Sequence, residues 1–172
     1  MNNPTRMLRV IFDTNIYGRI ATEPDGLALE ERIHHEKEFL VYGYTPIRNE
    51  IRNIPKTTKL SQKNRILLLH LYDKLTGNHF LPNSAKVNHI AKKYYDYYRS
   101  LGGGYSWETS IRVDFMIVAC ASMHGLDVIY SADNKTMSNK IAIKTYHNIN
   151  SNENLRTPHF FDYLELLRKF RN

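Results

Sequence analysis

Short apolar runs along the chain alternate with longer stretches that carry apolar residues on one side only. The runs Leu8–Phe12 and Phe39–Tyr42 are apolar throughout, which predicts two buried strands. Further strands are predicted over residues 127–130 and 141–146. Helical spacing of apolar residues, with Ser, Thr, Pro or Gly at the ends, predicts helices over residues 26–35, 45–55, 61–75, 84–102, 110–124 and from 157 to the end.

Strands that alternate with helices are typical of βαβ units and of a mostly parallel sheet. Right-handed crossovers place the helices on both faces of such a sheet. We therefore predict an α/β fold, a three-layer α/β/α sandwich around a mostly parallel sheet of four to five strands. The 172 residues are predicted to form a single domain, with a basic, Tyr-rich helical insertion around residues 56–107.

Composition excludes several classes of protein. One cysteine is too few for a disulfide scaffold or a Cys-rich zinc module. The longest apolar run, Phe115–Met123, is too short to cross a bilayer, and the first residues lack the apolar stretch of a signal peptide. We expect a cytoplasmic protein that does not bind a membrane.

Positive charge is concentrated in the middle of the chain. The net charge is +7, and the segment from Arg48 to Lys93 holds ten basic and two acidic residues. This excess favours a partner with many phosphate groups, although a solvated basic helix surface would have the same composition. The candidate RNA-binding residues are Arg48, Arg52, Lys56, Lys59 and Lys63, with Tyr95 as a base-stacking candidate.

Four acidic residues are predicted to converge at the edge where the parallel strands end. Asp13 follows the first strand, and Glu50 lies on the helix after the second. Asp114 begins a helix that leads into a later strand, and Asp133 follows that strand. Functional sites in parallel sheets lie at this edge. Clustered carboxylates repel one another, and a hard divalent cation such as Mg²⁺ or Mn²⁺ would remove the repulsion.

These residues resemble motifs of the PIN-domain family of metal-dependent nucleases. The stretch Val10–Asn15 resembles the family's apolar strand followed by an Asp-Thr-Asn sequence. Residues 114–121 and 125–133 resemble its helix-strand-Asp element, and residues 46–51 fit its helical Glu. The resemblance covers residues 8–18, 39–52 and 110–137 by motif, and the remainder by topology only.

The resemblance implies a PIN-like fold and a set of site residues. Asp13, Glu50, Asp114 and Asp133 would hold Mg²⁺ or Mn²⁺, directly or through water, while Thr14 and Asn15 would orient Asp13 or a bound water. The implied activity is endonucleolytic hydrolysis of single-stranded RNA. Many members are toxins of VapBC-type toxin–antitoxin pairs, which implies a homodimer and a small antitoxin as partners. The greater length of this chain, and Asn134 and Lys135 after Asp133, depart from the compact toxin pattern.

Other functions remain open at this stage. The same fold could serve as a non-catalytic RNA-binding or scaffold module, or as an RNA-processing nuclease without an antitoxin. Phosphoryl transfer through an aspartyl nucleophile usually needs a second Asp two positions later, where this chain has Asn15. Metal-free cleavage by two His side chains is a further alternative, and sensitivity to a chelator distinguishes it from the metal-dependent reaction.

Overall fold

The computed structural model describes residues 6–55, 57, 59–109 and 111–171, and in this part of the chain five parallel strands form one sheet. The strands are β1 (Leu8–Phe12), β2 (Phe39–Tyr44), β3 (Phe80–Leu81), β4 (Val128–Tyr130) and β5 (His159–Phe161). Their order across the sheet is β3-β2-β1-β4-β5. Every neighbouring pair is parallel, which confirms the predicted α/β class.

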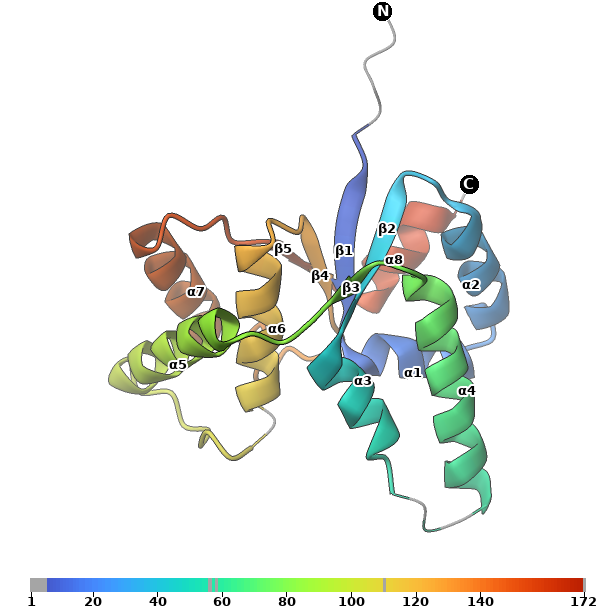
Figure 1. Cartoon of the computed structure of the whole chain (residues 1–172), viewed down its shortest axis with the longest axis horizontal. Helices are drawn as coiled ribbons and strands as arrows, with labels where there is room; N and C mark the ends of the chain where they lie inside the picture. Colours follow the sequence, from blue (N-terminus) through green and yellow to red (C-terminus); the bar gives the residue numbers. More distant parts are fainter. Residues whose placement is uncertain (1–5, 56, 58, 110, 172) are drawn as a thin grey trace, which may run out of the picture.

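Helices cover both faces of this sheet, as the predicted three-layer sandwich requires. They are α1 (Thr14–Thr22), α2 (Gly26–His35), α3 (Thr45–Arg52), α4 (Lys59–Thr76), α5 (Ala85–Ser100), α6 (Ile111–Met123), α7 (Lys140–Asn152) and α8 (Tyr163–Phe170). Figure 1 shows α5, α6 and α7 on one side of the sheet and α1, α2, α4 and α8 on the other. None of the described helices combines the length and the apolar character needed to cross a membrane.

The core follows from the apolar runs in the sequence. β1 is the central strand, and its Val10, Ile11 and Phe12 are fully buried because helices cover both faces. All residues of α6 from Asp114 to Ser122 are buried as well. A helix that is apolar on every side must be enclosed, and α6 lies against α5 and the sheet (Figure 1).

Two predicted elements at the C-terminal end were wrong. Residues 141–146 belong to helix α7, although Ile141 and Ile143 alternate with polar or small residues as in a strand. The Asn139 side chain accepts a hydrogen bond from the Ala142 backbone and starts this helix, whose buried side is Ala142, Tyr146 and Asn150. The final helix begins at Tyr163, after a capping box of Asp162 and Glu165, and the residues before it form the unpredicted strand β5.

Two further elements were missed. Helix α1 directly follows Asp13, and the short strand β3 comes from the segment predicted as a helical insertion. β3 pairs with β2 through Gly43↔Phe80 and Tyr44↔Leu81, so residues of that segment extend the sheet itself. A strand of two residues carries too little sequence pattern to be recognised.

The carboxyl ends of the strands define the edge on which the candidate site lies. β1 leads into α1, β2 leads into α3, and β4 leads into the loop 131–139, all at the lower side of Figure 1. α6 begins at the same side and runs back towards the start of β4. Residues far apart in the chain are therefore brought together there.

Candidate active site

The four predicted acids lie at this edge and are linked by short polar side chains. Asp13 is the N-cap of α1, and Glu50 is on α3. Asp114 is in the first turn of α6, and Asp133 lies in the loop after β4. The charges of Asp13, Glu50 and Asp133 all raise the pKa of Asp114, which agrees with their lying in one neighbourhood.

Asp13 is held in place by three hydrogen bonds and is only 5% exposed. Its Oδ1 accepts from the Thr14 backbone (2.7 Å), and its Oδ2 accepts from Asn15 Nδ2 (3.0 Å) and Ser131 Oγ (2.8 Å). These donors come from α1 and from the loop after β4. The first strand and the fourth are therefore coupled through one carboxylate.

Thr14 and Asn15 connect Asp13 to the rest of the site. The Thr14 hydroxyl donates to Glu50 Oε2 at 2.6 Å, which joins α1 to α3. Asn15 Oδ1 accepts from the Ala132 backbone at 2.9 Å, which ties α1 to the loop after β4. A residue with one donor and one acceptor is needed at position 15, and Asn supplies both.

Asp114 and Asp133 share the hydroxyl of Thr136. Thr136 Oγ1 lies 2.5 Å from Asp114 Oδ2 and also contacts Asp133 Oδ2. A hydroxyl has a single proton, so it can donate to only one carboxylate at a time. With no cation between them, the second contact is favourable only when one carboxyl group is itself protonated.

The pKa values identify which group takes that proton. Burial raises the pKa of Asp114 to about 8; the hydrogen bond from Thr136 opposes this shift, and the charges of Asp13, Asp133 and Glu50 add to it. Burial acts on Asp133 in the same direction, but bonds from the Thr136 hydroxyl, the backbone of Thr136 and Lys135, and the Lys135 charge together lower its pKa. Asp114 is therefore the protonated partner near neutral pH.

The pKa of Asp13 is raised as well, but less than that of Asp114. Burial raises the pKa of Asp13 to about 6, and the negative charges of Glu50 and Asp133 add to the shift. The bonds from Ser131 and Thr14 act in the opposite direction. Among the residues that the structure describes, no Lys, Arg or His forms an ion pair with any of the four acids.

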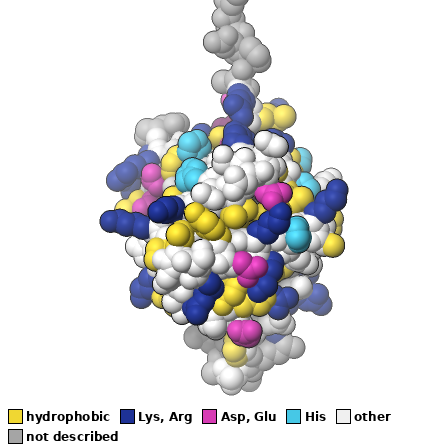
Figure 2. All heavy atoms as spheres, turned by 90° about the vertical axis from the view of Figure 1, so that its left-hand side faces the viewer, with side chains coloured by type: hydrophobic (Ala, Val, Ile, Leu, Met, Phe, Trp, Pro, Cys, Tyr) yellow, Lys and Arg dark blue, Asp and Glu magenta, His cyan; other side chains and the backbone are white. Residues whose placement is uncertain are grey.

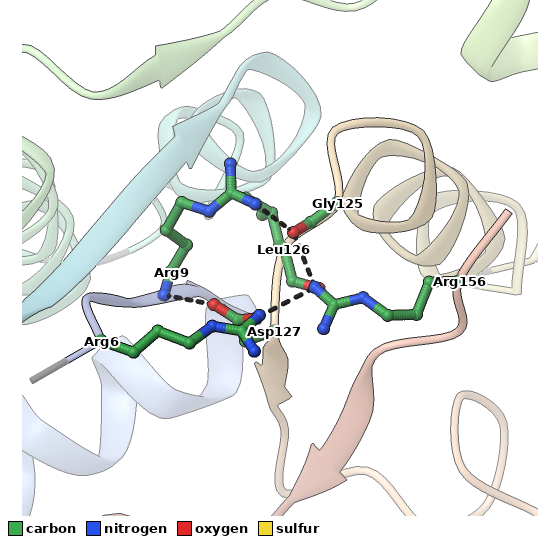
Figure 3. A network of polar contacts seen from close by, with 6 residues as sticks. All are labelled: Arg6, Arg9, Gly125, Leu126, Asp127 and Arg156. Carbon is green, nitrogen blue, oxygen red and sulfur yellow. Dashed lines mark hydrogen bonds and ion pairs between the residues drawn. The ribbon is translucent and has the colours of Figure 1, made fainter. Parts of the chain in front are cut away.

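The other buried aspartate, Asp127, shows what a compensated carboxylate looks like in this fold. Figure 3 shows Arg6, Arg156 and the backbone of Arg9 around it, at the opposite edge of the sheet. Arg6 and Arg156 each donate to Asp127 Oδ1 at 2.9 Å, and Arg9 N donates to Oδ2 at 2.9 Å. Burial alone would raise the pKa of Asp127, but these partners bring it below the ordinary value. Asp127 thus forms ion pairs with two Arg side chains. In the described part of the chain, none of the four acids at the carboxyl edge forms an ion pair.

The donor set at the carboxyl edge fits a hard divalent cation. All the side chains that meet there offer oxygen atoms, from carboxylates and from the hydroxyls of Thr14, Ser131 and Thr136. Oxygen ligands suit Mg²⁺ and Mn²⁺ rather than zinc. Within the described ranges, no three His, Cys, Asp or Glu side chains are close enough together in this structure to hold one ion.

The structure describes the side chains of four of the six predicted RNA-binding residues, which lie on α3, α4 and α5. Arg48 is bound to both Asp73 oxygens at 3.2 Å, and the Tyr95 ring packs against Trp107 at 5.1 Å between centroids. Arg52 and Lys63 are exposed, on α3 and α4. Lys56 and the Lys59 side chain lie outside the described residues.

Two residues that form hydrogen bonds to the acids, Ser131 and Thr136, were not predicted from the sequence. Ser131 links Asp13 to the Asp133 backbone, whose N–H donates to Ser131 Oγ at 3.0 Å, and Thr136 links Asp114 to Asp133. Thr136 follows Asp133 by three residues, a spacing that does not by itself indicate a contact with Asp114. Ser131 had no signal besides its position beside a strand end.

Comparison with known proteins identifies the fold. No protein-family model matches the sequence, and no curated protein matches it. A chain in the crystal structure of VapBC2 from Rickettsia felis bound to a DNA fragment from their promoter is similar, with a TM-score of 0.59 at 13% identity over 90% of this chain and 98% of that chain. A likeness at this identity concerns the architecture alone. The chain thus shares the fold of that neighbour, and its parallel five-stranded sheet between helices is consistent with the PIN-like fold that the sequence motifs implied.

Proposed function

We propose that this protein is a metal-dependent endoribonuclease that hydrolyses phosphodiester bonds of single-stranded RNA. The single observation that carries the proposal is the group of four carboxylates at the carboxyl edge. Two of them are buried at a raised pKa, and in the described part of the chain none of the four forms an ion pair with Lys, Arg or His. Burying carboxylates without ion pairs does not stabilise a fold. We therefore infer that these carboxylates serve to bind a ligand.

A divalent cation at this edge would be held by Asp13, Glu50, Asp114 and Asp133, and would supply an activated water and charge stabilisation at the scissile phosphate. The remaining residues keep these carboxylates in position. Thr14 and Asn15 orient Asp13, and the Thr136 hydroxyl contacts both Asp114 and Asp133. Thr14 also orients Glu50, so its single side chain positions acids from two elements.

The neighbour in the structure comparison supports a further part of the proposal. That structure is of VapBC2 bound to promoter DNA, so we propose that this chain is the toxin of a toxin–antitoxin pair and binds a small antitoxin. Co-expression with the product of the adjacent reading frame should yield a stable complex in which RNA cleavage is suppressed. A product that neither binds nor inhibits would leave a ribonuclease without an antitoxin. The homodimer that the resemblance implied can be measured by sedimentation.

The test of the activity is cleavage of single-stranded RNA by purified protein. We expect cutting with Mg²⁺ or Mn²⁺, none with EDTA, and a loss of at least about a hundredfold for Asp13→Asn, since that change removes a charged ligand from the site. Asp127→Asn is the matched control, because it alters a buried aspartate at the other edge of the sheet. Cutting that survives both EDTA and Asp13→Asn would overturn the proposal.

A non-catalytic RNA-binding module gives a different result in the same assay. Such a protein would bind RNA in a salt-dependent manner and cut it under no condition. Cutting that is insensitive to EDTA but lost on replacement of His would indicate the metal-free reaction instead.

A further inference from the structure

A cavity of about 350 Å³ shares one lining residue, Ser131, with the hydrogen-bond network of the candidate site. The loop after β4 contributes Ser131 and Ala132 to its wall, and β5 contributes Phe160 and Phe161. Ser131 belongs to both places, since it lines the cavity while its hydroxyl donates to Asp13 at 2.8 Å. Anything bound in the cavity would therefore be adjacent to the proposed cutting site.

Arg19 of α1 is fixed in the wall of this cavity. Its Nε donates to Glu23 Oε1 at 2.7 Å, and its guanidinium carbon lies 4.7 Å from the centre of the Tyr163 ring. These two contacts hold the guanidinium plane. Among the described residues, no acceptor takes the hydrogen atoms of its two terminal nitrogens, which are left to bind a ligand.

Asp162 and Glu165 supply acceptors in the same wall. Each carboxylate uses one oxygen in the capping box of α8, where Glu165 N donates to Asp162 Oδ1 and Asp162 N donates to Glu165 Oε2, both at 2.8 Å. The second oxygen of each has no partner within the described ranges. One cation and two carboxylates give the cavity a net negative charge, which disfavours a phosphate group.

Apolar groups complete the wall. Phe160 and Phe161 are half-buried, and Leu164 at the rim is 53% exposed. Aromatic side chains in a cavity wall favour a planar ring, because bases bind to aromatic side chains in single-strand binders. The wall of the cavity thus combines apolar side chains with the donors of Arg19 and the acceptors of Asp162 and Glu165.

We propose that this cavity binds a guanine base of the RNA, next to the bond that is cut. Guanine presents acceptors at N7 and O6, which match the paired donors of an Arg, and it presents N–H donors at N1 and N2, which match carboxylate oxygens. Adenine lacks the O6 acceptor, and uracil presents only one N–H donor. This inference rests on the proposed function, and it assigns Arg19, Asp162 and Glu165 to base selection.

The test is binding of short single-stranded oligouridylates that carry one central guanosine, inosine, adenosine or cytidine. The full-length Asp13→Asn protein is used so that the RNA stays intact. We expect the guanosine oligomer to bind at least about tenfold more tightly than the adenosine or cytidine oligomers, in line with the discrimination of one bidentate pair. Inosine lacks the N2 amino group and should lose part of the preference.

Variants then locate the preference. Arg19→Ala should abolish it, and Arg19→Lys, which keeps the charge but lacks the fork of donors, should reduce it. Arg32→Ala on α2 is the matched control and should leave the preference unchanged. Ala132→Phe fills the cavity from an exposed position and keeps the backbone donor to Asn15, so it gives a second reading if Arg19→Ala does not fold.

The outcomes separate this inference from the proposed function. Equal binding of all four oligomers, or a guanosine preference that survives both Arg19→Ala and Ala132→Phe, would overturn the inference and leave metal-dependent cutting untouched. A guanosine preference that depends on Arg19, in a wild-type protein that cuts no RNA, would support the cavity and contradict the nuclease.

Discussion

Asp114 concentrates the electrostatic cost of the site in one side chain. Its carboxyl group is 6% exposed, and burial raises its pKa from 3.8 to about 8. Between these two pH values the folded protein keeps a proton that the unfolded chain has released. The free energy of unfolding should therefore fall as pH rises through this range, and Asp13 acts in the same direction up to pH about 6.

Replacing Asp114 by a neutral side chain should therefore raise the free energy of unfolding at high pH. In EDTA, Asp114→Asn should make the protein more stable than wild type at pH about 8, by on the order of 5 kcal/mol, because the pKa of Asp114 rises from 3.8 to about 8 and one pKa unit corresponds to about 1.4 kcal/mol. The difference should vanish towards pH about 4. Thermal and urea unfolding across this pH range measure it.

Asp127→Asn provides the control for Asp114→Asn. The pKa of Asp127 is below its ordinary value, so its ion pairs contribute stability that is present above pH about 4 and lost as pH falls further. The control should therefore be less stable than wild type near neutral pH. Parallel pH curves for wild type and Asp114→Asn would show that Asp114 does not carry the cost assigned to it.

The four acidic residues of the site could be predicted from the sequence. The hydroxyl groups that connect them could not. Asp13 stood out because a carboxylate at the end of an apolar strand needs a partner. Thr136 and Ser131 act through their distances to acids that are remote in the chain, and those distances exist only after folding. Arg19 had no sequence signal, since its partner Tyr163 is far along the chain.

A buried polar network determines how the helices on one face of the sheet pack together. Tyr94 of α5 donates to Asn150 of α7, and Asn150 Nδ2 donates to Ser122 of α6 at 3.0 Å and to Thr157 at 2.9 Å. Tyr94 and Asn150 are at most 1% exposed. A network of this kind stabilises one packing arrangement because each member would be unsatisfied in another.

Removing one member should be costly. Tyr94→Phe leaves Asn150 Oδ1 buried without its donor, so we expect a loss of about 1–3 kcal/mol in the free energy of unfolding. Tyr97→Phe is the matched control one turn away, because Tyr97 is only half-buried and should change stability by less than about 0.5 kcal/mol. Chemical denaturation measures both, and equal small effects would contradict a stabilising role for the network.

Elements with a single strong pattern were predictable, and elements with conflicting patterns were not. β1, β2 and α6 follow from their apolar runs. α7 was mistaken for a strand because its β-branched residues alternate, while its Asn139 cap and its buried Ala142 and Tyr146 favour a helix. β5 was taken into the final helix because Thr157-Pro158 looks like a helix start, whereas the actual cap is Asp162.

On the scale of the whole molecule, folding disperses the positive charge that the sequence concentrates. Several cations of the segment Arg48–Lys93 pair with acids: Arg48 with Asp73, Lys74 with Glu30 and Glu31, Lys92 with Asp96, and Lys93 with Glu153. Figure 2 shows basic and acidic side chains mixed on the side of the molecule formed by α5 and α7. The basic residues that remain exposed on α3 and α4 include Arg52 and Lys63, and both helices extend beyond the carboxyl edge (Figure 1).

This placement predicts where RNA phosphates lie. The double variant Arg52→Ala/Lys63→Ala should weaken binding of single-stranded RNA and reduce the slope of log affinity against log salt by roughly 1.4, since each phosphate contact on a single strand contributes about 0.7. The matched control is Lys37→Ala/Arg168→Ala, which removes one exposed Lys and one exposed Arg. Equal slopes for the two double variants would place the RNA elsewhere.

The central claim is that the fold gathers four distant carboxylates into a site for a divalent cation. Anomalous diffraction from crystals soaked in Mn²⁺ tests it most directly. We expect anomalous density for manganese bound by oxygens of Asp13 and Asp114, with Glu50 and Asp133 as direct or water-mediated ligands. This density should be lost in Asp13→Asn crystals. Saturating Mn²⁺ with no anomalous density at this edge, and the Asp114 carboxyl still bonded to Thr136, would contradict it.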